Sequence, residues 1–220
     1  MSASAARSGS SFSLGFLFLS KERRAALDAV YEFARLVDDV VDEGSHSKEE
    51  AVRELDAWRA EVERLYAGKP VRPLAVRLAP FVERFTLPRE GFDGLLRGVA
   101  LDLEKRRYET YPELEEYLFG VAGTVGLLCV ELFGHQATAP EALRAYAVTM
   151  GNAFQLTNIM RDVGTDLEKG RVYLPLEDLR AAGCPLDSLL RREHTPAFAA
   201  VMRRQYDRAK AAYGQASTLL

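Results

Sequence analysis

The sequence predicts an all-α protein. Apolar residues recur at spacings of three and four along most of the 220 residues, which is the pattern of amphipathic helices. No run of alternating β-branched residues is present, so strands are not expected. A chain of this length buries about 70% of its surface on folding, which is enough for one core. We therefore expect a single helical domain over residues 11–220, after a loose segment, 1–10, that is rich in Ser, Ala and Gly.

Local signals in the sequence place the helices. A short helix is expected over 11–19, and Ser20 is the expected N-cap of a long helix that ends near Glu43. Ser47 and Glu50 have the spacing of a capping box and start the next helix. Proline marks the first turn of later helices and glycine marks their ends. The remaining helices are predicted over 73–86, 89–106, 112–133, 140–168, 176–181 and from about 196 onward.

Composition and charge exclude several classes of function. The 29 Lys and Arg against 32 Asp and Glu give a formal net charge of −3, which argues against nucleic acid as a partner because phosphate binding needs a basic face. Cys129 and Cys184 are too few for a disulfide framework or a cysteine zinc site. The apolar runs at 14–19 and 121–133 are too short for a cleaved signal or a membrane span. We expect a cytoplasmic protein.

An acidic segment ends the first long helix. Asp38 and Asp42 are four residues apart and share a helix face, which Arg35 and Tyr31 extend. Two carboxylates that are buried together repel each other strongly unless a cation lies between them. The alternative is a solvated acidic helix end before a loop.

A second polar stripe lies on the predicted helix over 140–168. It consists of Gln155, Asn158, Asp162 and Asp166, while the residues around its first part are apolar. Polar groups in an apolar helix need a polar cavity, a ligand or one another. A satisfied buried network is therefore the alternative to a binding site. Gly164 within this helix predicts a close backbone approach or a bend.

The two acidic faces together suggest a magnesium-diphosphate site. Mg²⁺ prefers oxygen ligands and binds through one or two carboxylates and substrate phosphates. Charge that develops on a departing diphosphate would be stabilised there. The carbocation left behind would need unreactive apolar walls. The expected lining is Phe12, Tyr31, Val121, Ala122, Val125, Gly126, Leu127 and Phe154.

Three glycines, Gly120, Gly123 and Gly126, are spaced by three residues. They do not form a phosphate loop, since no Gly-Lys-Ser/Thr follows, and no strand precedes them as in a dinucleotide site. Small residues at this spacing leave two alternatives, a close approach of another helix or space for a ligand.

These motifs resemble those of the squalene/phytoene synthase family. Residues 31–43 are similar to its first aspartate-rich motif and 155–175 to its second, and 102–108 and 117–126 also resemble family segments. The resemblance implies an isoprenoid-synthase-type helical bundle around a central apolar cavity. It also implies Mg²⁺-dependent head-to-head condensation of two farnesyl diphosphates to presqualene diphosphate and on to squalene, with NADPH only if squalene is formed. The motifs are most similar to those of bacterial presqualene diphosphate synthases of hopanoid biosynthesis.

The resemblance also assigns roles to residues. The metal ligands would be Asp38, Asp42, Asn158, Asp162 and Asp166. The four aspartates, Tyr117 and Tyr173 would be catalytic. The substrate contacts would be Ser11, Phe12, Tyr31, Arg35, Gln155, Asn158 and Arg171. The alternatives are a phytoene or dehydrosqualene synthase of carotenoid biosynthesis, and a non-catalytic helical scaffold of the same fold.

The sequence departs from the family pattern at both ends. Ser8, Gly9 and Ser10 stand where the family often has His or Lys, and Thr165 replaces a common Glu. Family members continue with further helices after the segment matched by 206–216, and we expect this chain to lack them. The resemblance implies prenyl diphosphates as partners. Peripheral membrane contact is left open, and the sequence does not indicate an oligomeric state.

Overall fold

The computed structural model describes residues 19–41, 46–135 and 139–219, and the predicted helix over 11–19 lies almost wholly outside them. In these ranges the regular structure is helical, apart from an isolated bridge between Arg107 and Val172. The elements in chain order are α1 (Lys21–Val41), α2 (Lys48–Tyr66), α3 (Pro73–Arg84), α4 (Arg89–Glu104), α5 (Tyr111–Leu118), η2 (Phe119–Gly123), α6 (Thr124–Phe133), α7 (Pro140–Glu168), α8 (Leu176–Ala181), α9 (Leu186–Leu190) and α10 (Pro196–Ser217). The all-α prediction is confirmed.

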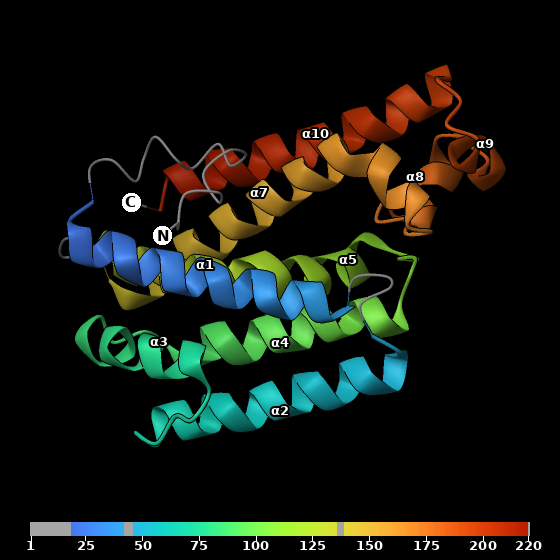
Figure 1. The fold of residues 1–220 in the computed structure, drawn as a ribbon. Helices are drawn as coiled ribbons and strands as arrows, with labels where there is room; N and C mark the ends of the chain where they lie inside the picture. The colour runs from blue at the N-terminus through green and yellow to red at the C-terminus, as the bar shows by residue number, and fades with distance from the viewer. Residues whose placement is uncertain (1–18, 42–45, 136–138, 220) are drawn as a thin grey trace.

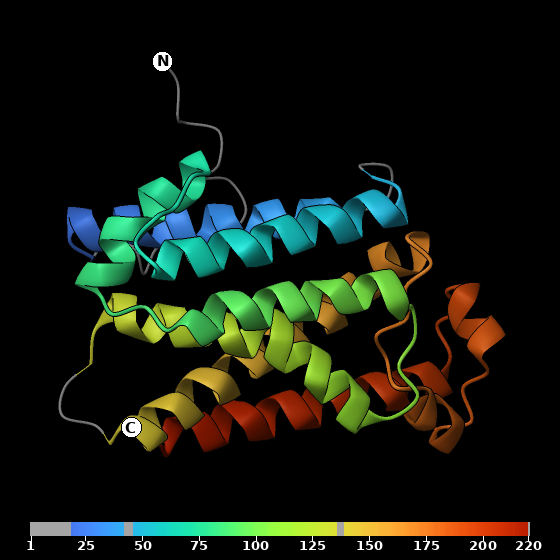
Figure 2. The same ribbon diagram turned by 90° about the horizontal axis from the view of Figure 1, so that it is seen from below.

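Among the described residues, two apolar clusters form the core, and the first includes side chains of α6 whereas the second includes side chains of α5. One cluster packs α1, α2, α3 and α4 together, with Phe33 in edge-to-face contact with Trp58 and Phe92. The other packs α5 and α7 against α8 and α10. Val121 of η2 contacts both clusters. Figures 1 and 2 show α7 and α10 side by side, on the opposite side of the bundle from α2.

The local signals in the sequence set the helix ends as expected. The Ser47 Oγ accepts a hydrogen bond from the Glu50 backbone N–H at 3.2 Å. In turn, the Glu50 carboxylate accepts one from the Ser47 backbone N–H at 2.8 Å. Ser20 caps α1 by accepting from the Arg23 N–H at 3.2 Å. Gly134 and Gly170 end α6 and α7 with positive φ values of 78° and 69°, which only glycine adopts without strain. The sequence does not predict the short helix α9.

Glycines of α4 and η2 bring two helices into backbone contact. A Cβ added to Gly98 would lie 2.6 Å from the Gly120 carbonyl carbon, and one on Gly120 would lie 2.6 Å from the Gly98 Cα. The helices are antiparallel, because further contacts pair Gly94 with Thr124 and Gly91 with Leu128. These glycines therefore serve helix approach.

The other two glycines of the spaced triplet serve the same purpose on a different side. A Cβ on Gly126 would lie 2.2 Å from the Ala147 carbonyl oxygen of α7, and one on Gly123 would meet the Asn152 side chain. Gly123 and Gly126 therefore allow α7 to approach closely, and they do not leave space for a ligand, which was the second alternative. Among the described residues, no other segment comes within 4 Å of a Cβ added to Gly164, and α7 continues through it, so in this part of the chain the predicted close approach is not found.

One continuous helix in the described part of the chain, Tyr111–Phe133, is long and apolar enough to cross a membrane by length and composition. It comprises α5, η2 and α6, and it packs between α4 and α7. Its apolar side chains are therefore used in part by the core of the bundle.

The glycine contact can be tested by stability. Gly120→Ala should lower the free energy of unfolding by about 1–3 kcal/mol, because the new methyl group meets the Gly98 backbone, which cannot rotate away. Gly214→Ala in α10 is the control, since its new methyl group meets nothing within 4 Å and should leave stability unchanged or raise it by about 1 kcal/mol. Urea denaturation of both variants measures the difference. Equal stabilities would contradict the contact.

Candidate active site

The candidate site lies at the end of the bundle where the C-terminal ends of α1, α4 and α7 come together. The segment that leaves α7 runs beside the segment that leaves α4. The Val172 N–H donates to the Arg106 carbonyl oxygen at 2.8 Å, and the Leu176 N–H donates to the Tyr108 carbonyl oxygen at 2.9 Å. This pairing of two loops places Arg171 and Tyr173 beneath the last turns of α7.

Arg171 connects the two acidic motifs. Its side chain is only 8% exposed, and its Nη2 donates to the carbonyl oxygen of Val41, the last residue of α1, at 3.3 Å. Asp38 lies one helical turn before Val41. The same guanidinium lowers the pKa of Asp166 at the end of α7. A single buried cation therefore joins the end of the first motif to the second.

Asp166 is a carboxylate of the site whose pKa is raised. Burial, followed by the negative charge of Asp162, raises its pKa from 3.8 to about 6, and Asp102 adds to the rise. Arg171 and Lys169 oppose this rise. Negative charges crowded in this way are favourable for a bound cation.

Asp102 of α4 is a site residue that the sequence analysis missed. Its Oδ1 accepts a hydrogen bond from the Tyr173 hydroxyl at 2.9 Å, and its Oδ2 accepts one from the Tyr117 hydroxyl at 3.2 Å. The two hydroxyls are themselves 3.2 Å apart. An acid within the apolar run 99–103 was a usable signal, because the same argument identified the polar stripe of α7.

Three tyrosine rings pack against one another beside Asp102. The ring centroid of Tyr117 lies 5.0 Å from that of Tyr173 and 5.4 Å from that of Tyr108. Tyr108 is fully buried, and its hydroxyl has no hydrogen-bond partner among the described residues. Burial, followed by the charge of Asp102, raises the pKa values of all three tyrosines, so they stay protonated.

The rest of the α7 stripe is engaged within its own helix. The Asn158 Nδ2 donates to the Gln155 Oε1 at 3.3 Å. Asp162 accepts two hydrogen bonds from the neighbouring Arg161, at 2.6 and 2.8 Å. The stripe is thus partly a satisfied network, although Asp162 remains near enough to raise the pKa of Asp166.

The face of α1 is more open than an enclosed cavity would require. Asp38 and Asp39 are exposed, and Arg35 forms an exposed ion pair with Asp39 at 3.9 Å. Tyr31, expected in the cavity wall, is 55% exposed. The predicted site residues Asp42, Ser11 and Phe12 lie outside the described residues.

The other expected wall residues divide into two groups. Leu127 is buried in the core and Gly126 packs on α7, so these two do not line a cavity. Val121, Ala122 and Val125 are half-buried. Phe154 is 39% exposed and meets the Tyr213 ring edge to face at 5.6 Å.

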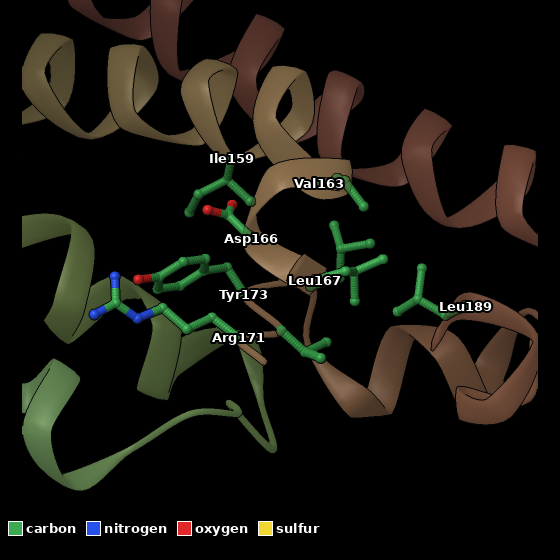
Figure 3. Close-up of a pocket in the computed structure, with 9 residues that line it drawn as sticks. Ile159, Val163, Asp166, Leu167, Arg171, Tyr173 and Leu189 are labelled. Atoms are coloured by element: carbon green, nitrogen blue, oxygen red, sulfur yellow. The ribbon is translucent and has the colours of Figure 1, made fainter. Parts of the chain in front are cut away.

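A small pocket opens at the end of α7 (Figure 3). Figure 3 shows the Asp166 carboxylate, the Tyr173 hydroxyl and the Arg171 guanidinium toward one end of it, and Val163, Leu167 and Leu189 toward the other. The pocket therefore has a charged end and an apolar end. In this structure the pocket is too small to hold a hydrocarbon chain.

Metal binding stays a prediction. No three His, Cys, Asp or Glu residues are close enough to hold a metal ion within the described ranges, from which Asp42 is absent. The donor set nevertheless has the chemistry for Mg²⁺, because Asp162 and Asp102 raise the pKa of Asp166 and all three present only oxygen ligands.

Comparison with known proteins adds to this geometry. A family model described as squalene/phytoene synthase matches residues 5–220. The chain is 38% identical over 211 residues to the chloroplastic phytoene synthase of Narcissus pseudonarcissus, and 37% identical over 209 residues to phytoene synthase 1 of Arabidopsis thaliana. Each alignment covers 93% of this chain and 49% of the relative. The chain thus spans about half the length of these plant proteins.

Solved structures with the same fold are also similar in sequence. The squalene synthase HpnC from Alicyclobacillus acidocaldarius superposes with a TM-score of 0.85 at 31% identity, over 95% of this chain and 77% of that one. A dehydrosqualene synthase in complex with ligand gives a TM-score of 0.83 at 31% identity, over 94% and 70% of the two chains. The arrangement of helices is therefore shared across nearly all of this chain.

The crowding of charge around Asp166 predicts a pH-dependent stability in protein freed of metal by a chelator. A carboxyl with a raised folded pKa loses its favourable contribution as the pH rises through that pKa. Asp166→Asn should therefore raise the free energy of unfolding at pH 8, by about 1 kcal/mol after allowance for solvent screening. The gain should disappear at pH 4, where the wild-type carboxyl is protonated.

Urea denaturation across this pH range gives the measurement. Asp207→Asn on α10, which removes an exposed carboxylate paired with Arg203, is the control and should show no gain that grows with pH. A wild-type protein as stable as Asp166→Asn at pH 8 would show that Asp166 bears no such cost.

Proposed function

Because this chain belongs to the squalene/phytoene synthase family, we propose that it condenses two farnesyl diphosphates head to head, with Mg²⁺, to presqualene diphosphate. Squalene is the further product when NADPH supplies a hydride. Of the observations, the position of Arg171 supports this most directly. Its buried guanidinium donates to the Val41 carbonyl oxygen after the first acidic motif, and it lowers the pKa of Asp166 in the second.

The diphosphate would bind between the two acidic motifs. The residues that would hold Mg²⁺ are Asp38, Asp42, Asp162 and Asp166, with Asn158 beside them. When bound, the metal supplies positive charge that stabilises the departing diphosphate. Arg171 adds a fixed guanidinium whose forked donors match phosphate oxygens. Because Arg171 is already anchored on Val41, little reorganisation is needed when negative charge develops.

The reaction also needs a place for a cation. Loss of diphosphate from one substrate leaves an allylic cation, which the double bond of the second substrate attacks. Loss of a proton then closes a cyclopropane and gives presqualene diphosphate. Tyr117 and Tyr173 support this step, because both are protonated and buried, and Tyr173 lines the same pocket as Asp166. The half-buried Val121, Ala122 and Val125 would contact the hydrocarbon chains.

A phytoene-forming reaction with C20 diphosphates is the second candidate. The plant relatives named above are phytoene synthases, whereas the solved neighbours are a squalene and a dehydrosqualene synthase. The motifs of this chain are compatible with either chain length. Paired assays with the two diphosphates separate them.

The proposal predicts that the protein with Mg²⁺ converts farnesyl diphosphate to presqualene diphosphate, and to squalene when NADPH is added. Asp162→Asn should lower kcat/KM by at least about 100-fold, because it removes a carboxylate at the diphosphate. Asp207→Asn, on the exposed surface of α10, should retain the wild-type rate. Lipid extraction with mass spectrometry identifies the products, and geranylgeranyl diphosphate is assayed in parallel.

Two results would count against this function. Turnover of the C20 substrate alone would favour phytoene synthesis. If neither diphosphate is consumed and Mg²⁺ with inorganic pyrophosphate does not raise the unfolding temperature, the chain is a helical scaffold of this fold.

A further inference from the structure

We propose that Asp102 is a positioning residue that fixes the hydroxyl groups of Tyr117 and Tyr173 for the condensation. The inference rests on the proposed function and adds to it a residue outside both acidic motifs. It follows from the hydrogen bonds of Asp102, from its place on α4, and from the way α4 contacts the following helix.

The helix contact itself places Asp102 beside Tyr117. The glycine contacts of α4 step along the helix by three and then four residues, and their partners on α6 and η2 step back by four residues each time. Gly98 against Gly120 is the innermost of these contacts. On α4, Asp102 lies one turn after Gly98, and on the facing helix Tyr117 lies three residues before Gly120. The Tyr117 hydroxyl is 3.2 Å from the Asp102 carboxylate. The pair therefore continues the antiparallel register.

The hydrogen bonds of the cluster assign the phenolic protons. Each hydroxyl has one proton, and an ionised carboxylate only accepts. Tyr173 gives its proton to Asp102 Oδ1, and Tyr117 lies within 3.2 Å of both Asp102 Oδ2 and the Tyr173 oxygen. Asp102 can therefore hold both protons on its two oxygens. A neutral residue at this position could not accept both with equal strength.

The orientation of these protons matters for a cationic reaction. With its proton held on Asp102, a phenolic oxygen presents lone pairs in its other directions, which stabilise nearby positive charge. If the carboxylate were removed, the hydroxyl could turn its proton toward the cation and oppose it. The rings themselves cannot easily move, because the Tyr108 ring stacks on that of Tyr173 at 5.8 Å and lies tilted against that of Tyr117 at 5.4 Å. Asp102 thus sets the rotation of the hydroxyls and not the place of the rings.

The test is Asp102→Asn, which keeps the shape and removes the charge. It should lower kcat about 10- to 100-fold while KM for farnesyl diphosphate changes less than about twofold. The matched control is Asp93→Asn on the same helix, where the carboxylate pairs with Arg89 on the surface, and its kcat should equal that of the wild type. Asp102→Glu should recover part of the loss, because it restores the charge.

A cycle with Tyr173→Phe separates positioning from a general structural effect. If Asp102 acts through the hydroxyl, the double variant Asp102→Asn with Tyr173→Phe should be no slower than the slower single variant. If Asp102→Asn does not fold, the rate of Tyr173→Phe decides, and a wild-type kcat in that variant overturns the proposal. A wild-type kcat in folded Asp102→Asn, or a change in KM alone, also overturns it.

Failure of this proposal and failure of the proposed function give different results. A wild-type protein that consumes no prenyl diphosphate removes the proposed function and this inference with it. A wild-type protein that turns over substrate, with Asp102→Asn equally fast, removes only the role of Asp102.

Discussion

The buried guanidinium of Arg171 is the interaction on which the site depends. It comes from a short segment after α7, yet it reaches the last carbonyl of α1 and lowers the pKa of Asp166. A buried arginine is costly unless its donors and its charge are matched. The Arg171 guanidinium donates to a carbonyl at the C-terminus of α1, which carries partial negative charge. Its positive charge also interacts with Asp166 near the end of α7. Arg171 thereby links the end of α1 to the end of α7, although the two acidic motifs are about 120 residues apart in sequence.

The site gathers several negative charges in a small space. The carboxylates of Asp162 and Asp102 both raise the pKa of Asp166. Each of the three carboxylates, Asp102, Asp162 and Asp166, has a different local environment. Tyrosine hydroxyls hold Asp102, Arg161 holds Asp162, and Asp166 is left half-buried with a raised pKa. The carboxylate at the pocket, Asp166, keeps a raised pKa despite Arg171 and Lys169, and a divalent cation there would be favourable.

Much of the fold could be predicted from sequence because helix ends are local. A capping serine, a proline in the first turn and a glycine with positive φ each act within four residues. The polar stripe of α7 was also visible, because a periodic pattern identifies its face. What could not be predicted depends on partners distant in sequence. Asp102 looks like an isolated acid until α4 is placed beside Tyr117, and the exposure of Tyr31 depends on what faces α1.

The glycine contact links the stability of the fold to the chemistry of the site. Gly98 is one turn before Asp102, and Gly120 is three residues after Tyr117. With no Cβ on either glycine, the two backbones touch, and this fixes the distance between α4 and η2 within a few tenths of an ångström. The adjacent contact in the register is a hydrogen bond that tolerates little more variation in length. A methyl group on Gly120 should therefore separate Asp102 from Tyr117 before the helices unfold. The same contact that holds the core together also aligns the carboxylate with the hydroxyl that it orients.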